Sequence, residues 1–163
     1  MFTKSILKNT GFSLIELLIV IAVTLVLFSF VIYNIHPAEQ KQKARDQRRL
    51  ADAIRYQEAI EEFKADNKVY PDVFGEVRVS NILPPSSTNI SVSSSGWILE
   101  DLSSYLDFLP TDPINKDEYV YKYVRNDTDF EFNIKLEYYL DKMSSDGGND
   151  DFLYEIGDDL TLL

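Results

Sequence analysis

Hydrophobic residues run almost without interruption from Phe12 to Ile35, and Glu16 is the one charged residue among these 24 positions. A helix rises about 1.5 Å per residue, so a helix of that length spans a hydrocarbon core of about 30 Å. The pattern therefore predicts a membrane-spanning helix over residues 12–36.

Apolar and charged positions then alternate with helical spacing through residues 37–68. One helix face is formed mainly by apolar residues at this spacing: Leu50, Ala53, Ile54, Gln57 and Ile60. Tyr56 and Phe63 lie at the edge of this face. We expect this face to pack on an outer domain. Pro37 disfavours helical geometry at the residue before it, so a kink is expected near His36, and Pro71 places the end of the helix near Asn67.

Residues 69–163 change to a period of two, which is typical of strands. The alternation predicts strands over residues 119–124 and 130–136, with a third short strand over 152–156. The apolar side of the second strand is expected to face the long helix, with its polar residues turned outward. The predicted fold class is α+β: a long N-terminal helix packed on a small antiparallel sheet.

Two segments of this outer domain carry weaker patterns. Residues 71–96 contain two adjacent prolines and a serine-rich run, which predicts a long irregular loop. Residues 97–106 predict a short helix that buries its large apolar side chains: Trp97, Ile98, Leu102 and Tyr105.

Charge is distributed unevenly along the 163 residues. Six basic residues fall between Lys41 and Arg55, whereas 8 basic and 23 acidic residues follow Arg55. The acidic part should repel nucleic acid, so no nucleic-acid site is expected. The basic cluster is interpreted as a solvated helix face, with contact to anionic lipid or to acidic neighbouring subunits as the alternative. The chain contains no cysteine, which excludes disulfides and thiol chemistry.

The residues before the apolar run indicate processing. Lys4 and Lys8 precede Gly11, and a cut between Gly11 and Phe12 would remove residues 1–11 and leave the helix as the new N-terminus. Glycine lets an extended backbone approach a protease closely. A carboxylate within a membrane helix is costly, so Glu16 is expected to have a partner, and the new amine of Phe12 lies four residues away on the same helical face.

The run Lys8-Asn9-Thr10-Gly11-Phe12-Ser13-Leu14-Ile15-Glu16-Leu17 resembles the class III leader of type IV pilins and pseudopilins. The resemblance implies cleavage after Gly11 by a prepilin peptidase, N-methylation of Phe12, and subunit docking through Glu16. It also implies identical subunits in a helical filament, assembled on an inner-membrane platform with a separate ATPase. Many family members have a glycine and a proline where this chain has Leu25 and Tyr33, so its helix should be more regular.

Other features bear on the branch of the family. Six basic residues after the helix favour the cytoplasmic side, but the cleavage motif favours an external head on a single-pass inner-membrane protein. The Leu-Pro-x-Asp-Pro turn ending at Pro113 is similar to that of major pseudopilins, and its Asp112 should form an Asx bond. The missing disulfide favours the branches without one, including the major pseudopilins of type II secretion.

An acidic, glycine-containing loop follows the second strand. Its oxygen-bearing side chains include Asp146, Asn149, Asp150 and Asp151. Such donors suit calcium, but the spacing is not that of an EF-hand. Major pseudopilins have a calcium site in a similarly placed loop. Two interpretations stay open, a calcium-binding loop and a solvated glycine-rich turn; no other cofactor is expected.

The sequence offers no catalytic pattern. His36 is the single histidine and lies at the membrane boundary, and the serines of the loop have no histidine partner. We therefore predict a non-enzymatic structural subunit of a type IV pilus-like filament, membrane-bound before assembly and extracellular or periplasmic after it. The alternatives are a major pseudopilin of type II secretion and a membrane-anchored binding domain that does not polymerise.

Overall fold

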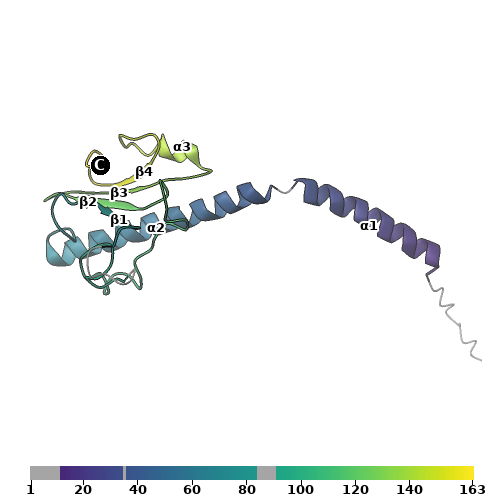
Figure 1. The fold of residues 1–163 in the computed structure, drawn as a ribbon, viewed down its shortest axis with the longest axis horizontal. Coiled ribbons are helices and arrows are strands. Elements are labelled where there is room, and N and C mark those ends of the chain that lie inside the picture. Colours follow the sequence, from purple (N-terminus) through teal and green to yellow (C-terminus); the bar gives the residue numbers. More distant parts are fainter. Residues whose placement is uncertain (1–11, 35, 84–90) are drawn as a thin grey trace, which may run out of the picture. The chain divides into compact units, whose positions relative to one another are not determined.

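The computed structural model describes residues 12–34, 36–83 and 91–163, and the chain forms two compact units that meet between Pro37 and Ala38 (Figure 1). The elements follow in this order: α1 (Leu14–Asn34), α2 (Pro37–Asn67), β1 (Arg78–Val79), β2 (Lys122–Arg125), β3 (Phe130–Ile134), α3 (Leu140–Met143) and β4 (Tyr154–Gly157).

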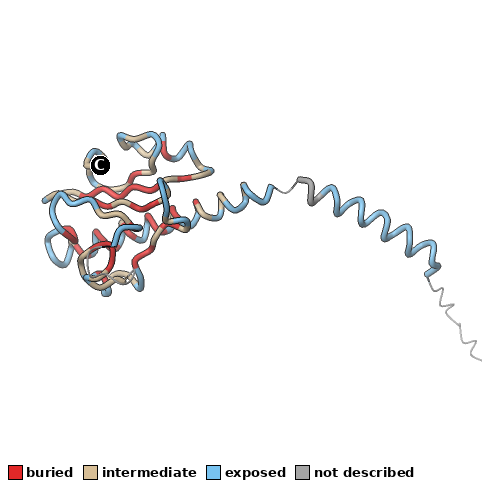
Figure 2. The backbone as a smooth tube through the Cα atoms, in the orientation of Figure 1, coloured by how far each residue is buried: buried red, intermediate tan, exposed pale blue. Residues whose placement is uncertain are grey.

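The first unit contains α1, in which residues 14–30 are all exposed (Figure 2). Helical structure is interrupted at His36, the residue before Pro37, where proline sterics favour a break. Across the described residues, no helix combines the length and the hydropathy that a membrane span requires.

The second unit is an α+β head, which confirms the predicted fold class. Its antiparallel sheet has the order β1-β2-β3-β4. The hairpin of β2 and β3 pairs Tyr123 with Phe132 and Arg125 with Phe130. Lys68 has a positive φ of 65°, and its N–H donates to the carbonyl of Lys64, so the chain leaves α2 in a left-handed C-terminal cap.

Aromatic side chains fill the space between α2 and the sheet. The Tyr56 ring lies 4.6 Å from that of Phe132 and 5.6 Å from that of Trp97. The Tyr56 hydroxyl and the Trp97 indole both donate to the carbonyl of Pro110, at 2.7 and 3.3 Å. Tyr56 is therefore the centre of the buried helix face and not its edge. Ile54, expected in that face, is 58% exposed.

Two expectations for the loops need correction. Residues 97–106 are not helical, because the Asp101 carboxylate accepts the Ser103 N–H and bends the backbone into turns. Trp97, Ile98 and Leu102 are nevertheless fully buried. The expected irregular loop contains β1, which pairs with β2 at the sheet edge.

The polar side of β3 also differs from expectation, because all five residues of the strand are buried. Glu131 and Asn133 alternate with the apolar residues, and were expected to face solvent. Residues following β4 cover them: the N–H groups of Leu162 and Leu163 donate to Glu131 Oε2 at 2.6 and 2.9 Å.

Candidate functional site

The start of α1 is a reciprocal capping box. The Ser13 N–H donates to Glu16 Oε2 at 3.1 Å, and the Glu16 N–H donates to Ser13 Oγ at 3.2 Å. Phe12 precedes this cap and is exposed. Gly11, the other residue of the predicted cut, lies outside the described residues. The cap holds the Glu16 carboxylate on the first helical turn, close in sequence to the predicted new amine.

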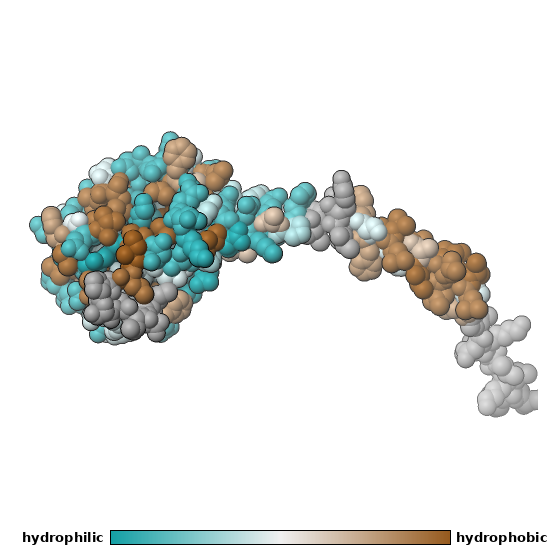
Figure 3. Space-filling model, in the orientation of Figure 1, coloured by the Kyte–Doolittle hydropathy of each residue, from teal (hydrophilic) through white to brown (hydrophobic). Residues whose placement is uncertain are grey.

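Apolar side chains, drawn in brown, cover most of α1 on the face shown in Figure 3. Leu14, Val26 and Phe28 are each at least 66% exposed. A helix that is apolar all round is normally buried against protein or lipid. The surface of α1 is therefore suited to contact other apolar helices or a bilayer.

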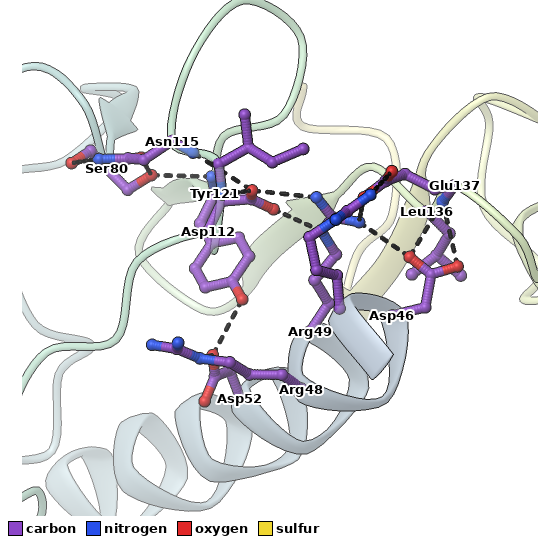
Figure 4. A network of polar contacts seen from close by, with 12 residues as sticks. Asp46, Arg48, Arg49, Asp52, Ser80, Asp112, Asn115, Tyr121, Leu136 and Glu137 are labelled. Atoms are coloured by element: carbon purple, nitrogen blue, oxygen red, sulfur yellow. Dashed lines mark hydrogen bonds and ion pairs between the residues drawn. The ribbon is translucent and has the colours of Figure 1, made fainter. Parts of the chain in front are cut away.

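A buried charge network joins α2 to the rest of the head (Figure 4). Arg49 has no exposed surface, and its guanidinium binds three carboxylates: Asp46 at 2.8 Å, Asp112 at 2.5 Å and Glu137 at 2.6 Å. Burial opposes its charge, but the hydrogen bonds with Asp112 and Glu137 outweigh this and raise the pKa of Arg49. Arg49 is thus the central cation of the network.

The carboxylates of this network have further partners. Arg45 binds Glu137 through two nitrogens at 2.6 and 2.5 Å, and this pairing lowers the pKa of Glu137. Asp46 accepts the backbone N–H groups of Glu137, Tyr138 and Tyr139. The network therefore fixes the segment after β3 against the middle of α2.

Asp112 lies in the Leu-Pro-x-Asp-Pro turn and accepts the Ile114 N–H at 2.7 Å, which is the Asx bond expected from the sequence. Nearby, the Tyr121 hydroxyl donates to Asp52 at 2.9 Å, and burial raises the pKa of both groups. The sequence identified the turn but gave no sign that Asp112 would meet Arg49.

The acidic loop uses its inner carboxylates to bind its own backbone. Asp146 accepts N–H groups from Gly148 and Glu155 at 3.0 and 2.8 Å, and Asp150 accepts that of Phe152. Asn149 and Asp151 are exposed. In the ranges that the structure describes, no three His, Cys, Asp or Glu side chains are grouped to hold a metal. Calcium binding by these four residues stays a prediction.

Sequence reasoning missed the polar residues behind this loop. Glu131, Asn133 and Glu155 are buried, and Asn133 Oδ1 has no hydrogen-bond partner within the described residues. Their alternation in the strands predicted an exposed face. The face is buried because segments distant in the sequence cover it. The amide nitrogen of Asn133, and not its Oδ1, faces the two carboxylates: it donates to Glu131 Oε1 at 2.7 Å and to Glu155 Oε1 at 3.4 Å.

Comparison with known proteins gives a family motif and three relatives. Residues 6–32 match the prokaryotic N-terminal methylation motif. The type II secretion system core protein G of Vibrio cholerae is 37% identical over 68 residues, which are 42% of this chain and 45% of that protein. The protein of the same name from Escherichia coli K12 is 29% identical over 113 residues, 68% of this chain and 70% of the relative.

The core protein G of Aeromonas hydrophila is 33% identical over 64 residues, 39% of this chain and 43% of that relative. The match thus spans less than half the length of the Vibrio and Aeromonas proteins. No solved structure matches the chain significantly.

Proposed function

Because the chain belongs to the type IV pilin and pseudopilin family, we propose that it is a filament subunit of the type II secretion kind, a major pseudopilin. Members of this family are structural subunits. The observation that carries the proposal is the methylation motif placed on a helix whose apolar side chains are exposed all round. The relatives named core protein G favour the secretion branch over a surface pilus.

In this proposal a prepilin peptidase cuts between Gly11 and Phe12 and methylates the new amine. Before assembly, α1 lies in the inner membrane and the head lies outside the cytoplasm. The acidic head supports a solvated position, since residues after Arg55 carry 23 acidic and 8 basic side chains. A platform with a separate ATPase then transfers the subunit into a periplasmic filament.

Assembly buries the helices against one another. Each helix brings one carboxylate, Glu16, into an apolar surrounding, and the N-terminal amine of a neighbouring copy would neutralise it. The capping box supports this role because it already holds Glu16 at the end of the helix where that amine forms.

Mass spectrometry of the mature protein tests the processing step. The expected N-terminus is N-methyl-Phe12, and a mature protein that still begins at Met1 would contradict the proposal. Electron microscopy of cells that overproduce the protein tests assembly. Short periplasmic rods and a secretion defect on deletion support the pseudopilin, whereas long surface fibres support a type IV pilus. Normal secretion and no filament of either kind would favour a non-polymerising binding domain.

We further propose calcium as a ligand of the head. The acidic loop with Asp146, Asn149, Asp150 and Asp151 supports this by composition, although its inner carboxylates bind backbone N–H groups. Calcium titration of the chelator-treated protein, followed by its thermal unfolding, checks binding. An unchanged unfolding temperature at saturating calcium would contradict it.

A further inference from the structure

One face of α2 is exposed along most of the helix and changes its charge along the way. Its residues recur every three or four positions, so they form a single row on the helix surface. The first half of this row, which we call the basic stripe, consists of Lys41, Ala44, Arg48 and Ala51, all of them exposed. Arg55 follows, and the row then continues with the exposed carboxylates of Glu58 and Glu62. The same helix face is therefore basic at one end and acidic at the other.

The folded chain neutralises the cations of the basic stripe only weakly. Lys41 forms no ion pair within the described residues. Arg48 Nε lies 3.7 Å from Asp52 Oδ2, and 56% of the arginine side chain is exposed. Asp52 is engaged elsewhere, since it accepts the Tyr121 hydroxyl at 2.9 Å. Because exposed ion pairs contribute little in water, both cations can bind a further partner.

The acidic end of the row forms one wall of a groove of about 370 Å³, which we call the acidic groove. Its other wall is the segment that leads into the Leu-Pro-x-Asp-Pro turn. The groove is lined by three carboxylates, those of Glu58, Glu62 and Asp107, and by one cation, Arg55. In the part of the chain that the structure describes, none of these carboxylates forms an ion pair. Phe108 also lines the groove and is 49% exposed, which adds an apolar contact surface.

The basic stripe and the acidic groove have complementary charges but cannot meet within one chain. Arg48 and Glu62 lie on the same helix, and the 14 positions between them correspond to about 21 Å. An anionic bilayer is a less suitable partner for this face, because the same row would bring Glu58 and Glu62 toward the lipid headgroups. A second copy of the chain offers a cation for each groove and a carboxylate for each stripe.

We propose that the basic stripe of one copy docks in the acidic groove of the next copy. Each copy then uses two different surfaces, so the contact is heterologous and further copies can be added in one direction. Ala44 and Ala51 have small side chains, which lets the wall of the groove approach the helix between the cations. The inference rests on the proposed filament function, since it names the head surfaces through which neighbouring subunits recognise each other.

The test is disulfide cross-linking, because the chain contains no cysteine and an introduced pair reports one contact. Cells that assemble Arg48→Cys/Glu62→Cys are oxidised, and the protein is separated by non-reducing electrophoresis. A disulfide bridges Cα atoms no more than about 7 Å apart, so these two cysteines can pair only between copies. We expect a ladder of dimers, trimers and larger products. The control is Arg48→Cys/Asp141→Cys, with its second cysteine at an exposed position of α3, which should give no ladder.

Charge reversal supplies a second readout. Arg48→Glu and Glu62→Lys should each lower the number of filaments about tenfold or more, because like charges then meet in the contact. The double variant Arg48→Glu/Glu62→Lys should recover most of this loss. Asp141→Lys is the matched control and should assemble normally. Thermal unfolding followed by Trp97 fluorescence shows that each variant folds.

The outcomes separate this contact from the filament proposal. If native filaments form but give no ladder and tolerate both reversals, this surface is wrong and the filament function stands. A single dimer band in place of the ladder would indicate a closed pair and contradict the head-to-tail contact. If Glu62→Lys does not recover the loss caused by Arg48→Glu, the stripe has another partner, such as anionic lipid, and the inference fails. Absence of any filament from the native chain would overturn both proposals.

Discussion

Arg49 and Asp112 are 63 positions apart in the sequence, yet the arginine Nε lies 2.5 Å from the aspartate Oδ2 and neither side chain is exposed. The pair joins the middle of α2 to the proline-rich turn of the head. Because each partner would be costly if buried alone, the contact specifies where this turn meets the helix.

Arg49→Met should destabilise the head by about 3–5 kcal/mol, since it leaves the buried carboxylates of Asp46 and Asp112 without their cation. Thermal unfolding of the full chain in micelles, followed by the fluorescence of the buried Trp97, measures the loss. The control is Arg55→Met, an exposed position on the same helix, where a change within about 0.5 kcal/mol is expected. Equal effects of the two substitutions would contradict the role given to Arg49.

Substitutions in the capping box separate helix capping from assembly. Glu16→Gln keeps a side chain that can accept the Ser13 N–H but removes the charge, so processing should continue while filament formation is lost. Ser13→Ala removes one capping bond at a cost of about 0.5–2 kcal/mol but should still allow filaments to form. Electron microscopy and N-terminal mass spectrometry report the two outcomes. Normal filaments from Glu16→Gln would show that the charge is not needed.

Stability should fall as pH rises from about 4.5 to about 7. The pKa of Glu155 is raised from 4.5 to about 7 in the folded chain, mainly by burial, so the unfolded chain loses this proton first. Folding is thus favoured by protonation, and the loss across this interval is at most about 3 kcal/mol. Thermal unfolding followed from about pH 4.5 to about pH 8 in the presence of a chelator checks it. Glu155→Gln should flatten the dependence of stability on pH. An equally steep dependence in that variant would mean that another group causes it.

Two isoleucines of α2 should differ strongly in their effect on stability. Ile60 is fully buried, so Ile60→Ala should cost about 2–5 kcal/mol, whereas Ile54 is 58% exposed and Ile54→Ala should change stability by about 0.5 kcal/mol or less. Thermal unfolding of both variants compares them directly. A larger loss of stability from Ile54→Ala than from Ile60→Ala would support the buried helix face that the spacing predicted.

Local patterns were sufficient for the two long helices, for the hairpin of β2 and β3 and for the fold class, but not for residues 97–106 or for β1. The apolar run beginning at Phe12 and the alternation in β3 each lie within one stretch of chain, where a repeat of 3.6 or two residues reflects which side must be buried. The contiguous motif ending in Glu16 likewise needs no folded partner to be recognised. The sequence alone therefore determined a helical N-terminal segment, an α+β head and the family resemblance.

The tertiary structure decided which of the polar residues are buried and with what. Arg49 meets Asp112 and Glu137 because the turn and the segment after β3 converge on α2, and Glu131 is covered by residues that follow β4. Spacing along one element carries no information about such contacts, since their partners lie 31 or more positions away. The polar face of β3 that contains Asn133 was expected to be exposed to solvent. The same covering residues bury it, and the pattern of the strand alone does not show this.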